Sequence, residues 1–173
     1  MSKIALIYWP RKGNVEKVAG MVADGLDDLK PGVYAISQVD LTALADHDLI
    51  ILGSSTVGAD NWEDSHRSRW YDFFKQLENV RFKGQKIAFF GLGDQVLYPE
   101  HFVDGMMAIK KEFARHDVEF IGKWPAQGYD FQESASLEGD DFIGLAVDED
   151  QQPELTKERV DQWVAQVRKE SGL

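Results

Sequence analysis

A short loop near the start of the chain carries residues suited to binding a phosphate. It runs from Trp9 to Asn14, directly after an apolar run and directly before a segment with helical spacing. A helix N-terminus exposes unpaired N–H groups and a partial positive charge, and both attract an anion. Arg11 and Lys12 add two charged groups for the same phosphate. The loop lacks the GxxxxGKS/T pattern of a Walker A site, and an ordinary strand–helix connection with two solvated basic residues is the alternative interpretation.

A second candidate is the aromatic side chain of Tyr98, in the segment 91–99 after a later apolar run. A planar ring at a strand end can stack on a flat heterocycle, which adds about 0.5–1.5 kcal/mol beyond the burial of area. The segment begins Gly91-Leu92-Gly93, but Val96 stands at the third glycine position of GxGxxG, so it predicts no dinucleotide site. A half-buried loop tyrosine without a ligand is the alternative.

Other familiar site chemistries find no support in the sequence. The chain has no Cys, which excludes disulfides, thiol nucleophiles and Cys-ligated metal centres. The four histidines, His47, His66, His101 and His116, show neither metal-ligand spacing nor a catalytic context. We therefore expect no catalytic residue and no metal site.

Apolar runs that alternate with amphipathic segments predict the elements that position these loops. The predicted strands are 3–8, 33–36, 49–52, 86–90 and 118–121, and a strand-like run follows at 142–147. Predicted helices begin at Asn14, which we expect to be an N-cap, around Trp70 and Phe102, and near Pro153. This alternation predicts one α/β domain over residues 1–173, with a parallel sheet covered by helices on both faces.

The topology of such a sheet locates the ligand. In an open α/β sheet, ligands bind beyond the carboxyl ends of the strands, where the strand order reverses. With five strands in the order 2-1-3-4-5, that point lies between the first and third strands. The loops expected there are 9–14, 54–68 and 91–99.

The net charge of the chain and its pattern of apolar residues indicate which partners it can bind and whether it spans a membrane. The net charge of −11 disfavours nucleic acid and anionic membranes, and favours docking to a protein with a basic patch. No apolar run reaches 18 residues, and the first one is too short for a signal peptide, so we expect a cytoplasmic protein without membrane spans.

Several segments resemble those of the long-chain flavodoxins. The most specific is Phe90–Tyr98, FGLGDQVLY, which resembles the loop that contacts the isoalloxazine ring with its stacking tyrosine. Supporting matches are KWPAQGYDF at 123–131, FIGLAVDED at 142–150 and QPELTK at 152–157. The resemblance implies a three-layer flavodoxin-like sandwich, in which the segment 122–141 is an insertion in the last strand.

The same resemblance implies a function. It is that of a low-potential one-electron carrier with non-covalently bound FMN, a monomer that shuttles electrons between redox proteins. Donors and acceptors of the ferredoxin- or flavodoxin-reductase type are the expected partners. The cofactor-binding residues that it implies are Trp9, Pro10, Arg11, Lys12, Gly13, Asn14, Val15, Ser55, Thr56, Val57, Gly58, Trp62, Gly93, Asp94, Gln95, Tyr98 and Asp148.

The phosphate loop departs from the family pattern, which is typically T/S-x-T-G-x-T. Pro10, Lys12 and Val15 occupy the hydroxyl positions here, and Gly13 alone is retained. Each lost hydroxyl contact costs about 0.5–1.5 kcal/mol. Either the two basic residues of the loop offset this cost by charge, or the loop has lost its affinity for the phosphate. Pro10 also removes one N–H donor.

The middle loop departs as well. The family often stacks a Trp on the flavin just after the Thr, and that position is Val57 in this chain. Either Val57 or Trp62, which lies in a longer loop, is expected to cover the inner face of the ring.

Two other functions remain open at this point. One is an FMN-dependent quinone or nitro reductase on the same fold, and the other is a flavin-free binding module, which the altered phosphate loop suggests. An electron-transfer protein is favoured over an enzyme with its own small-molecule substrate.

Overall fold

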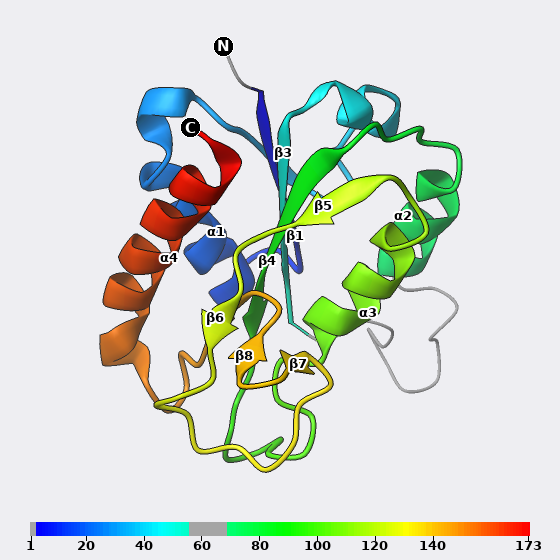
Figure 1. The fold of residues 1–173 in the computed structure, drawn as a ribbon. Helices are drawn as coiled ribbons and strands as arrows, with labels where there is room; N and C mark the ends of the chain where they lie inside the picture. Colours follow the sequence, from blue (N-terminus) through cyan, green and yellow to red (C-terminus); the bar gives the residue numbers. More distant parts are fainter. Residues whose placement is uncertain (1–2, 56–68) are drawn as a thin grey trace.

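The computed structural model describes residues 3–55 and 69–173. Its main sheet has the strand order β2-β1-β3-β4-β5, and every neighbouring pair is parallel (Figure 1). The strands are β1 (Ile4–Trp9), β2 (Gly32–Ala35), β3 (Leu49–Ser54), β4 (Gln85–Leu92) and β5 (Val118–Phe120). The predicted fold class and strand order are therefore confirmed.

Within residues 3–55 and 69–173, four α-helices cover the two faces of this sheet, two on each side (Figure 1). They are α1 (Asn14–Asp24), α2 (Arg69–Leu77), α3 (Gly105–Phe113) and α4 (Thr156–Ser171). Short 3-10 helices lie at Asp27–Leu29, Leu41–Asp46 and Pro153–Leu155. The second of these occupies the connection between β2 and β3, where the sequence predicts a weak helix or none.

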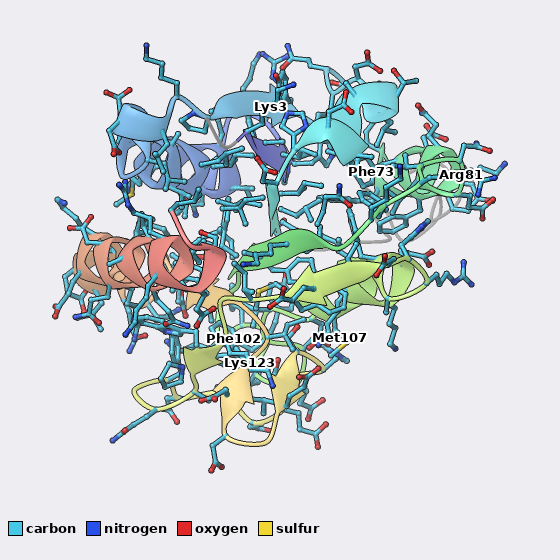
Figure 2. All side chains as sticks on the ribbon, turned by 45° about the horizontal axis from the view of Figure 1, so that its top comes forward. Lys3, Phe73, Arg81, Phe102, Met107 and Lys123 are labelled. Atoms are coloured by element: carbon cyan, nitrogen blue, oxygen red, sulfur yellow. The ribbon has the colours of Figure 1, made fainter. Side chains whose placement is uncertain are left out.

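The alternation of side chains along each strand divides the interior into two cores. In β1, Ala5 and Ile7 pack with α2 and α3, whereas Leu6 and Tyr8 pack with α1 and α4. β3 is buried along its whole length, as a central parallel strand must be. In Figure 2, Phe73 and Phe102 belong to the core between the sheet and helices α2 and α3. Lys3, Arg81 and Lys123 are exposed.

The last strand of the sheet is divided by the insertion. β5 pairs with the first part of β4, and β9 (Leu145–Val147) pairs with its last part. The insertion between them forms a small antiparallel sheet of β6 (Trp124–Pro125), β8 (Asp141–Phe142) and β7 (Leu137–Glu138). The predicted single run 142–147 is thus two strands that belong to different sheets.

Gly144 explains where this run divides. A Cβ atom at Gly144 would lie 2.2 Å from the carbonyl oxygen of Phe89, so only glycine allows the chain to approach the backbone of β4 this closely. The chain leaves the small sheet after Phe142 and joins the main sheet at Leu145. A continuous apolar run gives no sign of this change of sheet.

The helix predicted from Asn14 begins there, but its predicted N-cap is off by one residue. Gly13, and not Asn14, is the N-cap of α1, and no side chain caps this helix. Asn14 is already the first helical residue, and its side chain is exposed. The N-terminus of α1 therefore keeps its backbone N–H groups free of a side-chain cap.

Candidate functional site

Strand register brings three loops together at one edge of the main sheet. Trp9 at the end of β1 is paired in register with Ser54 at the end of β3, and Ser54 is paired with Gly91 near the end of β4. The loops that follow these strands therefore start side by side, at the lower end of the sheet in Figure 1. This is the edge where the predicted strand order locates a ligand.

The first loop is exposed and folds around one carboxylate. Residues 10–14 are all exposed, and Lys12 has a left-handed backbone with φ of 61°. Glu16, in the first turn of α1, accepts hydrogen bonds from the Tyr8 hydroxyl at 2.5 Å and from the Lys12 N–H at 2.9 Å. These contacts fix the shape of the loop from its own helix.

The same carboxylate sets the ionisation of its neighbours. The hydrogen bond from Tyr8, then that from the Lys12 N–H, and then the charge of Arg11 lower the pKa of Glu16. Burial, followed by the hydrogen bond to Glu16, raises the pKa of Tyr8. Glu16 is therefore ionised at neutral pH, and it offsets part of the positive charge that Arg11 brings to the loop.

The start of α1 offers donors for an anion. The N–H of Lys17 bonds to the carbonyl of Gly13 at 3.1 Å, so the three preceding helical N–H groups lie in the unsatisfied first turn. The side chain of Val15, at one of the former hydroxyl positions, is buried in the core and adds no polar group. The donors of this loop are thus backbone amides and basic side chains.

Two polar side-chain atoms at the ends of β1 and β3 are buried without a partner. The indole Nε1 of Trp9 and the hydroxyl of Ser54 have no hydrogen-bond partner in the part of the chain that the structure describes. Ser54 is fully buried, with 0% exposure, and it is the register neighbour of Trp9. Unpaired buried donors are uncommon in folded proteins and call for an explanation.

The third loop, 93–98, is organised by the carboxylate of Asp94. This carboxylate accepts the N–H groups of Val96 and Leu97 at 3.0 Å each and the side-chain amide of Gln151 at 3.1 Å. These bonds, that from Leu97 first, hold the pKa of Asp94 below its usual range against the effect of burial. The Asp94 side chain, which the resemblance assigns to the flavin, therefore stabilises its own loop by hydrogen bonds.

The carboxylate of Asp148, which follows β9, also binds backbone N–H groups of the third loop and of the turn after β9. It is fully buried, and its two oxygens accept the N–H groups of Gln95, Asp150 and Gln151 at 2.9–3.1 Å. The resemblance implies that Asp148 binds the cofactor, and in the structure its carboxylate binds the backbone of the third loop. Asp148 thereby joins the third loop to the turn that precedes α4.

The insertion supports the third loop from outside, a role that sequence reasoning missed. The side-chain oxygen of buried Gln95 accepts the N–H of Asp130. Two further N–H groups, of Gln132 and Glu133, bond to the carbonyl of Pro99 at 2.8 and 2.9 Å. Most of these groups belong to the backbone, so residue types in the sequence give no signal for the contacts.

The tip of the third loop presents an apolar surface. Val96, Leu97 and Tyr98 are 61%, 70% and 64% exposed, and they are consecutive in the chain. A ring that is two-thirds exposed beside a ligand edge can receive a flat partner on one face. Tyr98 is thus exposed in this loop, and its stacking role stays a prediction.

The second loop is described only at its start. Ser55 is half-buried at the end of β3, directly after Ser54. The predicted contacts of Thr56, Val57, Gly58 and Trp62 lie outside the described residues. Of the predicted site residues, the structure thus brings together the first loop, Ser55, the third loop and Asp148.

Residues 3–55 and 69–173 contain neither a metal-binding cluster nor a membrane-spanning helix. No group of three or more His, Asp or Glu side chains there could hold a metal ion. None of the described helices is long and apolar enough to span a membrane.

Comparisons with known proteins agree with this architecture. The family model for flavodoxins matches residues 6–163. A flavodoxin of Picosynechococcus sp. is 38% identical over 175 residues that cover 100% of both chains. One of Klebsiella pneumoniae is 38% identical over 174 residues and covers 100% of this chain and 97% of its own. Among solved structures, Fusobacterium nucleatum flavodoxin bound to flavin mononucleotide has a TM-score of 0.84 at 24% identity, covering 98% of this chain and 99% of that one. The chain belongs to the flavodoxin family.

Proposed function

We propose that this protein binds FMN without a covalent bond at the edge formed by the three loops, and that it carries electrons between redox proteins. The observation that carries the proposal is the unsatisfied first turn of α1, which lies at the same edge of the sheet as the loop with the exposed ring of Tyr98. Donors without acceptors fit a phosphorylated ligand, and the exposed ring fits a flat one. The Fusobacterium flavodoxin, which shares this fold, is bound to FMN.

The first loop holds the phosphate through charge and backbone amides. The unsatisfied first turn of α1 directs its N–H groups and its partial positive charge toward the anion. Lys12 and Arg11, both exposed, add positive charge, part of which Glu16 offsets. This arrangement takes the place of the hydroxyl groups absent at Pro10, Lys12 and Val15.

The third loop holds the ring. Tyr98 stacks on the flavin, and backbone groups of Gly93, Asp94 and Gln95 line its edge in a loop whose shape Asp94 and Asp148 fix. The flavin supplies the one-electron chemistry when it is bound, and the protein tunes it. Ser55 and the four residues Thr56, Val57, Gly58 and Trp62 complete the site on the resemblance alone.

Negative charge beside the loops favours a low reduction potential. Burial, and then repulsion from Asp94, Asp148 and Glu149, raises the pKa of Asp150, so these carboxylates share one negative field. At an effective dielectric of about 20 and a distance of about 8 Å, one carboxylate costs an added electron about 2 kcal/mol. The protein is therefore a low-potential carrier.

The surface fits transient protein partners. The exposed apolar residues 96–98 form the tip of the loop proposed to hold the ring, and the chain as a whole carries a net charge of −11. An apolar centre with acidic surroundings suits brief docking to a basic patch, as on reductases of the ferredoxin or flavodoxin type. We place the protein in the cytoplasm as a one-domain monomer. The flavodoxin matches give no support to a quinone or nitro reductase or to a flavin-free module.

The test is a titration of the purified protein, stripped of any bound flavin, with FMN. We expect quenching of flavin fluorescence with one FMN per chain, followed by reduction with NADPH only when a flavodoxin-type reductase is added. Rapid oxidation of NADPH by the protein and a quinone alone would contradict the proposal in favour of an enzyme. The absence of FMN binding would contradict it outright.

A further inference from the structure

Two donors at the ends of β1 and β3 have no hydrogen-bond partner among residues 3–55 and 69–173. The indole N–H of Trp9 and the hydroxyl of Ser54 are buried and unpartnered within the described residues. Other tryptophans show that this fold can satisfy an indole: Nε1 of Trp163 bonds to the carbonyl of Gly122 at 2.8 Å, and that of Trp124 to the Tyr129 hydroxyl at 2.9 Å. A buried donor without an acceptor lowers stability, so this pair needs a reason.

The position of Trp9 and Ser54 in the sheet explains why their donors have no partner within the described residues. Trp9 and Ser54 are register neighbours at the last positions of β1 and β3, directly before the first and second loops. The strand order reverses between these two strands, so their carboxyl ends form the floor of the ligand edge. The other unpartnered buried groups, on Trp70, Glu149 and Thr156, are not register neighbours at this edge.

The packing of Trp9 holds its donor in place. The half-buried indole contacts the side chains of both cores, one on each face of the sheet. Such a ring loses little freedom when its N–H finds an acceptor, and so it is a preorganised donor. Ser54 is equally fixed, because it is enclosed between β1 and β4 with 0% exposure.

We propose that the Trp9 indole N–H and the Ser54 hydroxyl donate hydrogen bonds to oxygen atoms of the ribityl phosphate tail of FMN. They replace donors that the first loop lost when Pro10, Lys12 and Val15 took the hydroxyl positions. This inference rests on the proposed function, because it needs FMN at this edge. It makes the two strand ends, and not only the loop, part of the binding site.

The test compares two variants that delete the donors with little change of shape, Trp9→Phe and Ser54→Ala. Trp163→Phe is the matched control, because it makes the same change to an indole whose N–H already has an acceptor. Each flavin-free protein is melted to obtain its Tm and is titrated with FMN and with riboflavin, which lacks the phosphate. Fluorescence quenching gives the Kd values.

We expect each donor deletion to raise the Kd for FMN about tenfold while the Tm of the flavin-free protein stays equal or rises. Trp163→Phe should do the reverse, with a lower Tm and an unchanged Kd. If the riboflavin Kd rises equally, the acceptor is a ribityl oxygen; if only the FMN Kd rises, it is the phosphate.

An unchanged FMN Kd in both variants would overturn the inference and leave the proposed function standing. A rise in Kd that comes with a matching loss of Tm would also overturn it, because the two groups would then be structural. Failure of the unmodified protein to bind FMN would instead overturn the proposed function itself.

Discussion

Glu16 gives the first loop its shape through two hydrogen bonds, from the Tyr8 hydroxyl and from the backbone N–H of Lys12. Both bonds favour the ionised carboxylate, and together they lower its pKa below the usual 4.5. A carboxylate in the first turn of a helix also benefits from the helix dipole, which would hold a phosphate at the same place. Glu16 therefore gives the anion site its shape, and its negative charge offsets part of the positive charge of the same site.

This arrangement makes stability depend on pH in a defined direction. The unfolded chain binds a proton at Glu16 at a higher pH than the folded chain does, because folding lowers this pKa. The stabilisation by Glu16 is complete above about pH 4.5 and is lost as the pH falls through the lower folded pKa.

We predict that Glu16→Gln flattens the acid limb of the stability curve. The glutamine oxygen still accepts a hydrogen bond, but it does not titrate. Urea midpoints of the flavin-free protein at pH values from 7 to 3 measure the effect, and Glu100→Gln, at an exposed position, is the control. Equal acid limbs for the Glu16 variant and the parent protein would contradict the role of Glu16.

At the scale of elements, two buried carboxylates hold the loops after β4 and β9 as one unit. Asp148 binds the N–H of Gln95 across 53 positions of the chain, and Asp94 binds the side chain of Gln151 across 57. The N–H groups at these turns are thus satisfied by charged acceptors and not by water. These hydrogen bonds hold the loop that carries Tyr98 in position.

We predict that Asp148→Asn lowers both stability and FMN affinity. One side-chain oxygen becomes an NH2 group that faces backbone N–H donors, which should cost roughly 2–4 kcal/mol of unfolding free energy. Urea denaturation and FMN titration measure the two effects. Asp161→Asn removes the same charge from a side chain that is 59% exposed, and it should change little. Equal effects of the two substitutions would show that only charge matters.

The elements themselves could largely be predicted from the sequence, because they follow from local patterns. The unbroken apolar run at 49–52 predicts a strand buried on both faces, and β3 is buried throughout. The helical spacing of Val15 and Val18 predicts α1, which buries both. Register then places the loops together, so the location of the site follows as well.

The remaining features depend on contacts that no local pattern records. The division of the last strand follows from the approach of Gly144 to Phe89. The bond of Gln95 to Asp130 joins two loops 35 positions apart through a backbone N–H, which every residue except proline has. Only the three-dimensional structure shows that the side chains of Trp9 and Ser54 lie side by side without a hydrogen-bond partner among the described residues.

At the scale of the molecule, the net charge of −11 and the apolar tip at 96–98 act on partners in different ways. Long-range attraction speeds the encounter with a basic protein and is screened by salt, over a Debye length of about 10 Å at 0.1 M. Apolar contact acts only after the encounter, and salt does little to it. The two contributions can therefore be separated by ionic strength.

We predict that electron transfer from a basic reductase slows steeply between low and high salt, and that Leu97→Ala slows it by a constant factor at every salt concentration. Leu97 is 70% exposed and its side chain supports no hydrogen bond of the loop, so FMN binding should be preserved in the variant. Stopped-flow reduction of the FMN-loaded proteins across a salt series measures both effects. A Leu97→Ala rate equal to that of the parent protein would remove the loop tip from the docking surface. A rate independent of salt would show that the acidic charge does not guide the encounter.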